Sequence, residues 1–312
     1  MAASTAFTAE LVESYVDNLE LLELKDNKIY KLAGSIKAKG PEHFWVKDSV
    51  RASKTPSSSA KAEGVQFTGQ RGSDAVRIWN TAQLFHEDIQ VTGTLQRSDH
   101  IGVDDRFAFE AEKTEKAVAK DIERAMLYGV RAQGTYTDGT STQSANRAMD
   151  GVTELVKDNA TDNYSDATAD NGAVPPALDE DLLNGYVQMT WDNGDREKDL
   201  DVFTGAIQKG AIDLFTTPNQ RNIEAKSKMV VLPVDTIATN FGNVNLHLHR
   251  EVASDDLVGI DSSQVYKAVM LAPRTEKYAK RGDSIDGAVE AELTVELRRP
   301  ENCFFVTNLA VA

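Results

Sequence analysis

The most regular hydrophobic pattern in the chain lies between residues 104 and 128. Apolar or small side chains recur there at steps of three and four, the spacing that puts them on one face of an α-helix. They are Phe107, Ala111, Thr114, Val118, Ile122 and Ala125. A helix of this length spans about 37 Å and needs a partner along its whole apolar face. We therefore expect Phe107, Val118 and Ile122 to lie in the core.

Weaker helical patterns flank this segment. Residues 8–26 predict an acidic amphipathic helix whose apolar face carries Leu11, Tyr15, Leu19 and Leu22. Helices are also predicted over 178–188 and 204–215. The run 157–172 is almost wholly polar, and we expect it to be a solvated loop.

Strand-like patterns dominate the last third of the chain. The predicted strands there are 229–232, 244–249, 257–260, 266–271, 288–297 and 304–311. Earlier in the chain, strands are predicted at 75–79 and 89–92, a short helix or strand at 43–50, and an extended connector at 31–40. The chain is therefore expected to be a mixed α+β protein, helix-rich in its first and middle parts and strand-rich at its end, and the absence of a repeat of fixed period excludes solenoids and propellers.

The segment 51–73 is rich in Ser, Gly and Pro, and Val65 and Phe67 are its only sizeable apolar residues. It is too polar to form a core and too long for a simple turn, so we expect an exposed hairpin or loop. Its charged residues are mostly basic: Arg51, Lys54, Lys61 and Arg71 against Glu63. Such a projection would be attracted to an acidic face of a neighbouring subunit.

Composition narrows the class of protein. The 312 residues carry 34 Lys and Arg against 49 Asp and Glu, a net charge of −15. This balance argues against a protein that holds nucleic acid by releasing counterions. The single cysteine, Cys303, excludes an internal disulfide framework. No apolar run is long enough for a transmembrane helix, and Met1–Phe7 lacks the features of a secretory signal.

Motifs of catalysis and ligand binding are missing from the sequence. It has no phosphate-binding glycine loop and no Gly-x-Ser-x-Gly motif, and its acidic stretches do not match a calcium loop. His247 and His249 would share one face of a strand, and a surface-facing pair is expected because no third metal ligand is spaced nearby. Cys303 lies beside Phe304 and is expected to be buried. We predict no catalytic, cofactor or metal site.

The order of several short motifs resembles the major capsid proteins of tailed phages, and among them the SU-ten-like major head proteins. The motifs span roughly residues 41–300. They are Phe44-Trp-Val-Lys-Asp-Ser-Val50, Arg77-Ile-Trp-Asn-Thr-Ala-Gln-Leu-Phe85, Val91-Thr-Gly-Thr94, Asp121-Ile-Glu123, Arg147-Ala-Met-Asp-Gly151, Asn240-Phe-Gly242, Gly259-Ile-Asp261 and Lys280-Arg-Gly-Asp-Ser284 with Glu290-Ala-Glu-Leu-Thr-Val-Glu296. The first 40 residues depart from the pattern, because a Thr-Pro-Phe expected there is absent.

The resemblance implies the Hong Kong 97-like capsid fold. Its expected parts are an N-terminal arm (1–40), an extended loop with flanking strands (41–80), a peripheral domain with the spine helix at about 104–128 (81–135), an axial domain (136–228) and returning peripheral strands (229–312). Because the arm precedes every motif, deleting residues 1–30 is expected to leave a folded subunit that cannot close shells.

The resemblance also implies a structural, non-enzymatic function. The chain would assemble from hexamers and pentamers, in the host cytoplasm, into the icosahedral shell of a virion. That shell would enclose double-stranded DNA without sequence-specific binding, and its partners would be a portal and decoration or scaffolding proteins, with no membrane. The alternative is an encapsulin-like bacterial protein cage. The expected assembly contacts are Leu11, Tyr15, Leu19, Arg51, Lys54, Lys61, Glu63, Val65, Phe67 and Arg71.

Overall fold

The computed structural model describes residues 27–48, 50, 53–66, 75–98, 105–132, 146–172, 174–194, 199–215, 235–280 and 282–311. Several predictions fall outside these residues and are not tested by the structure. They are the helix at 8–26 with Leu11, Tyr15 and Leu19, the contact residues Arg51, Phe67 and Arg71, and the strand at 229–232.

The long helix of the sequence pattern is α4 (Arg106–Tyr128). The Asp105 side chain caps its start by accepting a hydrogen bond from the Ala108 N–H at 3.2 Å, and Gly129 follows its last turn. Phe107, Val118 and Ile122 are all buried. The apolar stripe is therefore the face that packs inward.

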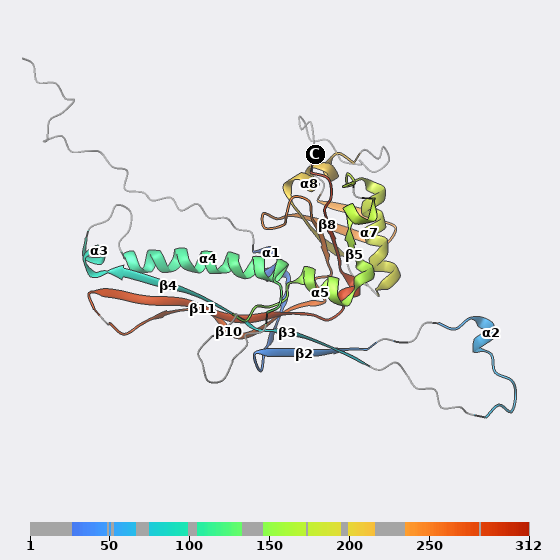
Figure 1. The fold of residues 1–312 in the computed structure, drawn as a ribbon, viewed down its shortest axis with the longest axis horizontal. Helices are drawn as coiled ribbons and strands as arrows, with labels where there is room; N and C mark the ends of the chain where they lie inside the picture. The colour runs from blue at the N-terminus through green and yellow to red at the C-terminus, as the bar shows by residue number, and fades with distance from the viewer. Residues whose placement is uncertain are drawn as a thin grey trace, which may run out of the picture.

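A four-stranded sheet lies under α4 (Figure 1). Its strands, in spatial order, are β1 (Gly34–Lys37), β10 (Val265–Lys277), β11 (Ser284–Leu297) and β4 (Gln83–Thr92). β1 runs parallel to β10, and the other neighbours are antiparallel. The register between β10 and β11 shifts twice between Val269 and Arg274, so β10 is irregular in its middle.

A two-stranded ribbon of β2 (Glu42–Lys47) and β3 (Val76–Thr81) packs against this sheet. Trp45 and Ile78 lie opposite each other in the ribbon and both join the core beneath α4. Phe44 and Val46, the two neighbours of Trp45 along the chain, face outward and are exposed. The two-residue alternation of a strand decides which side chains are buried here.

A six-stranded sheet forms the second half of the molecule. Its order is β5 (Tyr164–Asp166), β12 (Phe304–Thr307), β9 (Leu257–Ile260), β6 (Leu200–Thr204), β8 (Gly242–Leu248) and β7 (Thr236–Thr239). Both faces of its central strands are covered. Phe304 packs in the core that includes α7 (Glu180–Asn193) and α8 (Ala206–Asp213), whereas Phe305 packs in the core that includes α4.

The remaining elements are short. They are α1 (Lys28–Leu32), α2 (Pro56–Ser59), α3 (Gly93–Arg97), α5 (Val152–Asn159), α6 (Ala167–Asp170) and the 3-10 turns η1 (Thr161–Asn163) and η2 (Pro300–Asn302).

The expectation that 157–172 forms a solvated loop is wrong. The run contains the end of α5, η1, β5 and α6. Its polar side chains satisfy buried backbone groups: Asn163, itself buried, donates to the carbonyls of Glu301 at 2.5 Å and Cys303 at 2.8 Å. Polar composition was a poor guide to the secondary structure here, because some polar side chains, such as Asn163, are buried and hydrogen-bonded, while others, such as Lys157 and Asp162, are exposed.

The predicted helix at 204–215 also begins too early. Residues 200–204 form β6, and α8 starts at Ala206. Every residue of β6 is buried, including Asp201 and Thr204. A strand covered on both faces does not alternate between apolar and polar residues, so β6 lacks the pattern from which strands were predicted.

The strands after residue 229 do not all return to the sheet under α4. Of the strands that the structure describes after residue 229, β10 and β11 join that sheet, whereas β7, β8, β9 and β12 join β5 and β6 in the other one. Alternation identifies a strand, but the partner of each strand depends on contacts between residues far apart in sequence.

The predicted arm likewise ends earlier than residue 40. Ile29, in α1, is only 2% exposed, and β1 is a strand of the four-stranded sheet. The body of the subunit thus begins no later than α1. A deletion of residues 1–30 would remove Ile29 from the core, so the folded subunit that was predicted should lose stability.

Candidate assembly surfaces

The described part of the segment between β2 and β3 projects from the body. Residues 53–66 are exposed except for half-buried Lys54, and none of them belongs to either hydrophobic core. Figure 1 shows α2, within this segment, set apart from the rest of the subunit. Local hydrogen bonds shape α2, among them the one in which the Thr55 side chain caps the helix by accepting from the Ser58 N–H at 3.4 Å. The exposed side chains of this segment are available to contact another molecule.

Four of the predicted contact residues lie in this projection. Lys54, Lys61, Glu63 and Val65 are within residues 53–66, and Val65 has 55% of its surface exposed. Two lysines against one glutamate make the described part cationic, on a chain with a net charge of −15. All four lie outside both hydrophobic cores, and Lys61, Glu63 and Val65 are exposed.

The base of the projection is held firmly on the main sheet. The Trp45 Nε1–H donates to the Leu297 carbonyl at 2.9 Å, and the His43 Nε2 lies 2.6 Å from a Glu296 carboxylate oxygen. Lys47 pairs with Glu301 farther along the ribbon. The projection therefore extends from a rigid ribbon.

Asn80 joins the ribbon to the rest of the body. This fully buried side chain donates to the carbonyls of Asp150 and Val295, each at 2.9 Å, and accepts from the Asp150 N–H at 2.8 Å. Burial raises the pKa of the Asp150 carboxyl, opposed by the hydrogen bond from the Arg131 N–H at 2.6 Å and by the charge of that residue. The Arg131 guanidinium lies 4.2 Å from the centre of the Trp79 ring. Asn80 and Asp150 belong to the resemblance motifs, but their pairing required the structure.

A buried carboxylate joins three parts of the chain beneath α4. Glu123 is 1% exposed and accepts from the N–H groups of Ile29 at 2.7 Å and Tyr30 at 2.9 Å, in the first turn of α1. The His249 Nε2 lies 3.0 Å from the same carboxylate. Glu123 thus fixes the start of the described chain and the end of β8 to the long helix.

His249 contradicts the expectation of a surface-facing pair with His247. Its side chain is completely buried, whereas His247 is half-buried beside Asp201, with 3.1 Å between Nε2 and Oδ1. The two rings do share a face, because both pack against Phe203, but Glu123 of α4 covers that face at His249. Its Nδ1 accepts from the Glu251 N–H at 3.2 Å, so in the neutral ring the proton is on Nε2 and is donated to Glu123.

The last residue of α4 is fastened to the second sheet. The Tyr128 hydroxyl donates to Asp256 Oδ2 at 2.5 Å and accepts from the Ala253 N–H at 3.1 Å. Burial, followed by the hydrogen bond to Asp256, raises the pKa of Tyr128 far above its usual value. Burial also raises the pKa of Asp256. The phenol stays protonated and acts as a fixed donor between the two halves of the molecule.

Two kinds of reactive group can be assessed among the described residues, metal-binding clusters and the cysteine thiol. Among them, no three His, Cys, Asp or Glu side chains are grouped to hold a metal ion. Burial raises the pKa of Cys303 to about 12, so at neutral pH it is a thiol and not a nucleophilic thiolate. No helix in the described part of the chain is long and apolar enough to span a membrane.

This fold, with a long helix over one sheet, a second two-sided sheet and a projecting ribbon, is the fold of phage capsid subunits. The capsid of an empty GTA particle matches with a TM-score of 0.64 at 11% identity, over 99% of this chain and 100% of that chain. A structure from Mycobacterium phage Bobi matches with 0.58 at 14% identity, over 95% of each chain. The structure titled for the major capsid and decoration proteins of phage G matches with 0.58 at 9% identity, over 99% of this chain and 100% of that chain.

Sequence comparison identifies the family. Residues 1–310 match the family described as SU10 major capsid protein, so the chain belongs to that family and is a structural protein of a capsid shell. A search of curated proteins finds no match. The predicted α+β capsid fold is confirmed, and the comparisons give no support to the alternative of a bacterial protein cage.

Proposed function

We propose that this chain forms the icosahedral head shell of a tailed phage, as hexamers and pentamers that enclose double-stranded DNA. Membership of the capsid family supports self-association. The observation that carries the proposal is the projecting segment 53–66, whose exposed residues have no place in the core of their own subunit. Laid on a neighbouring subunit, it would link copies of the chain into a continuous shell.

In this proposal, the two halves of the molecule correspond to the two domains of the capsid fold. The four-stranded sheet with α4 is the peripheral domain, and the six-stranded sheet with α7 and α8 is the axial domain. This division assigns β7, β8, β9 and β12 to the axial domain. The buried links at Glu123 and Tyr128 then connect the two domains within each subunit.

The proposed relation to DNA is containment. A net charge of −15 gives the shell little affinity for phosphate, so it would enclose the genome without gripping it. The further partners in this proposal are a portal and decoration or scaffolding proteins, and assembly takes place in the host cytoplasm. The chain would act as a building unit with no catalytic activity.

Electron microscopy of particles formed by the full chain tests the proposal. Icosahedral shells that contain DNA, when isolated from an infected host, are the expected result. Shells filled with protein cargo would instead favour a bacterial cage, and a lasting small oligomer under all assembly conditions would contradict shell formation.

A charge-reversal variant tests the carrying observation. Lys54→Glu with Lys61→Glu should lower the yield of shells while leaving thermal unfolding of the subunit unchanged, because both residues lie outside the core. The matched control is Lys54→Arg with Lys61→Arg, which keeps the charge and should assemble normally. Equal yields from both variants would contradict an electrostatic contact made by the projection.

A further inference from the structure

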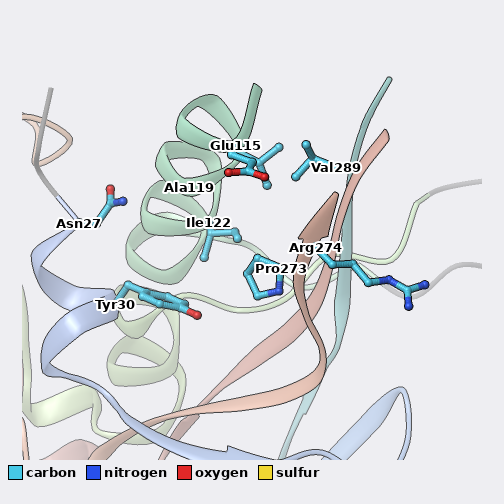
Figure 2. Close-up of a pocket in the computed structure, with 9 residues that line it drawn as sticks. Asn27, Tyr30, Glu115, Ala119, Ile122, Pro273, Arg274 and Val289 are labelled. Atoms are coloured by element: carbon cyan, nitrogen blue, oxygen red, sulfur yellow. The ribbon is translucent and has the colours of Figure 1, made fainter. Parts of the chain in front are cut away.

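Two hollows beside α4 differ in how their charged groups are satisfied. One is a cavity of about 230 Å³ between α4 and β10 (Figure 2). Glu115 and Arg274 line it together with apolar side chains, and both have partners. The Thr275 hydroxyl donates to Glu115, and the Arg274 guanidinium lies 2.7 Å from a Glu276 carboxylate oxygen. The charged groups of this cavity are therefore already engaged within the subunit.

The second hollow is an open groove of about 460 Å³ between α4 and β4. Consecutive residues of β4, Gln83 to Glu87, line one side, and the helix residues Asp121, Arg124 and Ala125 line part of the other. Among the strands that the structure describes, β4 has β11 as its single neighbour, so its second edge carries N–H and C=O groups that no described strand pairs. The groove therefore runs along an edge that can accept another strand.

Negative charge prevails in the groove. The side chains of Glu87 and Asp121 are both exposed there. Partial burial, followed by the charges of Glu87 and Glu251, raises the pKa of the Asp121 carboxyl despite the opposing charges of Arg124 and Lys120. Arg124 is itself engaged by Glu251, with 3.3 Å between Nη1 and Oε2. A cationic group placed beside Glu87 and Asp121 would relieve the repulsion between them.

We propose that this groove binds an extended basic segment of another protein, which pairs with β4 as an added strand. The main chain of that segment would bond to the open edge of β4, and lysine or arginine side chains at every second position would lie next to Glu87 and Asp121. The inference concerns a single subunit and goes beyond shell formation, so either can fail without the other.

The chain's own cationic segment, 53–66, is a poor occupant of the groove. The helix α2 interrupts it from Pro56 to Ser59. Lys54 and Lys61 are seven residues apart, so in a strand they would point to opposite faces. A separate partner with regularly spaced basic residues fits the groove better than a second copy of this chain.

Binding of a defined peptide to the full-length chain tests the proposal. The probe is the blocked, fluorescent peptide Lys-Val-Lys-Val-Lys-Val-Lys, and fluorescence anisotropy at low ionic strength should show saturable binding. Glu87→Gln with Asp121→Asn should weaken binding about tenfold, because two exposed charge pairs are lost. The matched control is Asp88→Asn with Glu112→Gln. It removes one exposed carboxylate of β4 and one of α4 that lie outside the groove, and it should bind like the wild type.

Two N-methylated versions of the probe test the addition of a strand. The N–H groups of successive residues in a strand point to opposite edges, so methylation of the lysine nitrogens and methylation of the valine nitrogens block different edges. One version should lose binding, and the other should retain it. Loss from both versions, or from neither, would overturn the pairing with β4.

The remaining results also count against the proposal. Absence of saturable binding would show that the groove takes no basic peptide. Equal weakening by the two double variants would indicate attraction to the net charge of the chain. Tighter binding of a peptide with the sequence of residues 53–66 would assign the groove to a second copy of the chain.

Discussion

The region under α4 and the projecting segment 53–66 use the same chain for opposite purposes. Beneath α4, apolar side chains and the fully satisfied carboxylate of Glu123 hold the sheet, the helix and the start of the chain together. In the projection, small polar and cationic residues are exposed and contribute nothing to either core. The region under α4 stabilises the folded subunit, and the projecting segment is available for contacts between subunits. Substitutions should therefore separate the two properties.

Ile122→Asp should have the largest effect on the subunit. Ile122 is 3% exposed, and a carboxylate buried there without a partner costs several kcal/mol, comparable to the whole stability of about 5–15 kcal/mol. We expect insoluble or unfolded protein, measured by circular dichroism and thermal unfolding. Ala117→Asp on the exposed side of the same helix is the control and should fold normally. Wild-type unfolding of the Ile122 variant would refute the assignment of the buried face.

Two truncations locate the boundary between the body and the arm. Deleting 1–30 removes Ile29 from the core, at a cost of about 2–5 kcal/mol, and takes two donors from Glu123. Deleting 1–26 keeps α1 and should cost much less. The free energies of unfolding in urea should differ by at least the contribution of Ile29, and equal values would show that α1 is not part of the body.

Glu123→Leu should destabilise the subunit by about 3–5 kcal/mol, because it leaves the two N–H donors and His249 buried without their acceptor. Glu123→Gln keeps one acceptor oxygen and should lose less. Urea titration measures both. If Glu123→Leu is as stable as the wild type, the contacts of Glu123 do not stabilise the subunit.

Replacement of residues 53–71 by a short Gly-Ser turn should have the smallest effect on the subunit and a complete effect on assembly. Thermal unfolding should be unchanged, because the described part of this segment lies outside both cores. Shells should be lost, as judged by sedimentation and electron microscopy. A Gly-Ser tract of the original length is the control for chain length, and normal shells from it would show that the side chains are dispensable.

Ionic strength gives a milder test of the same region. Exposed charge pairs are worth only about 0.2–1 kcal/mol each and are screened by salt. Wild-type shells should therefore dissociate more readily as salt is raised, and the Lys54→Glu, Lys61→Glu variant should show a weaker salt dependence. Light scattering across a salt series measures both.

The sequence by itself determined the features that depend on local periodicity. The stripe from Phe107 to Ala125 predicted α4 to within two residues at its start, because a helix records its buried face at steps of three and four. The polarity of 51–73 predicted an exposed segment, and the described part of it is exposed. The burial of Cys303 followed from its apolar neighbours. The ordered motifs identified the capsid family.

Only the tertiary structure decided which distant residues meet. Alternation revealed strands after residue 229 but not their division between two sheets, since pairing depends on contacts that sequence spacing does not encode. His249 was expected at the surface, yet with Glu123 it forms a buried pair beside the backbone of α1. Burying a polar group is favourable only when its partners are in place. Those partners come from positions 94 and 126 residues away, so folding alone brings them together.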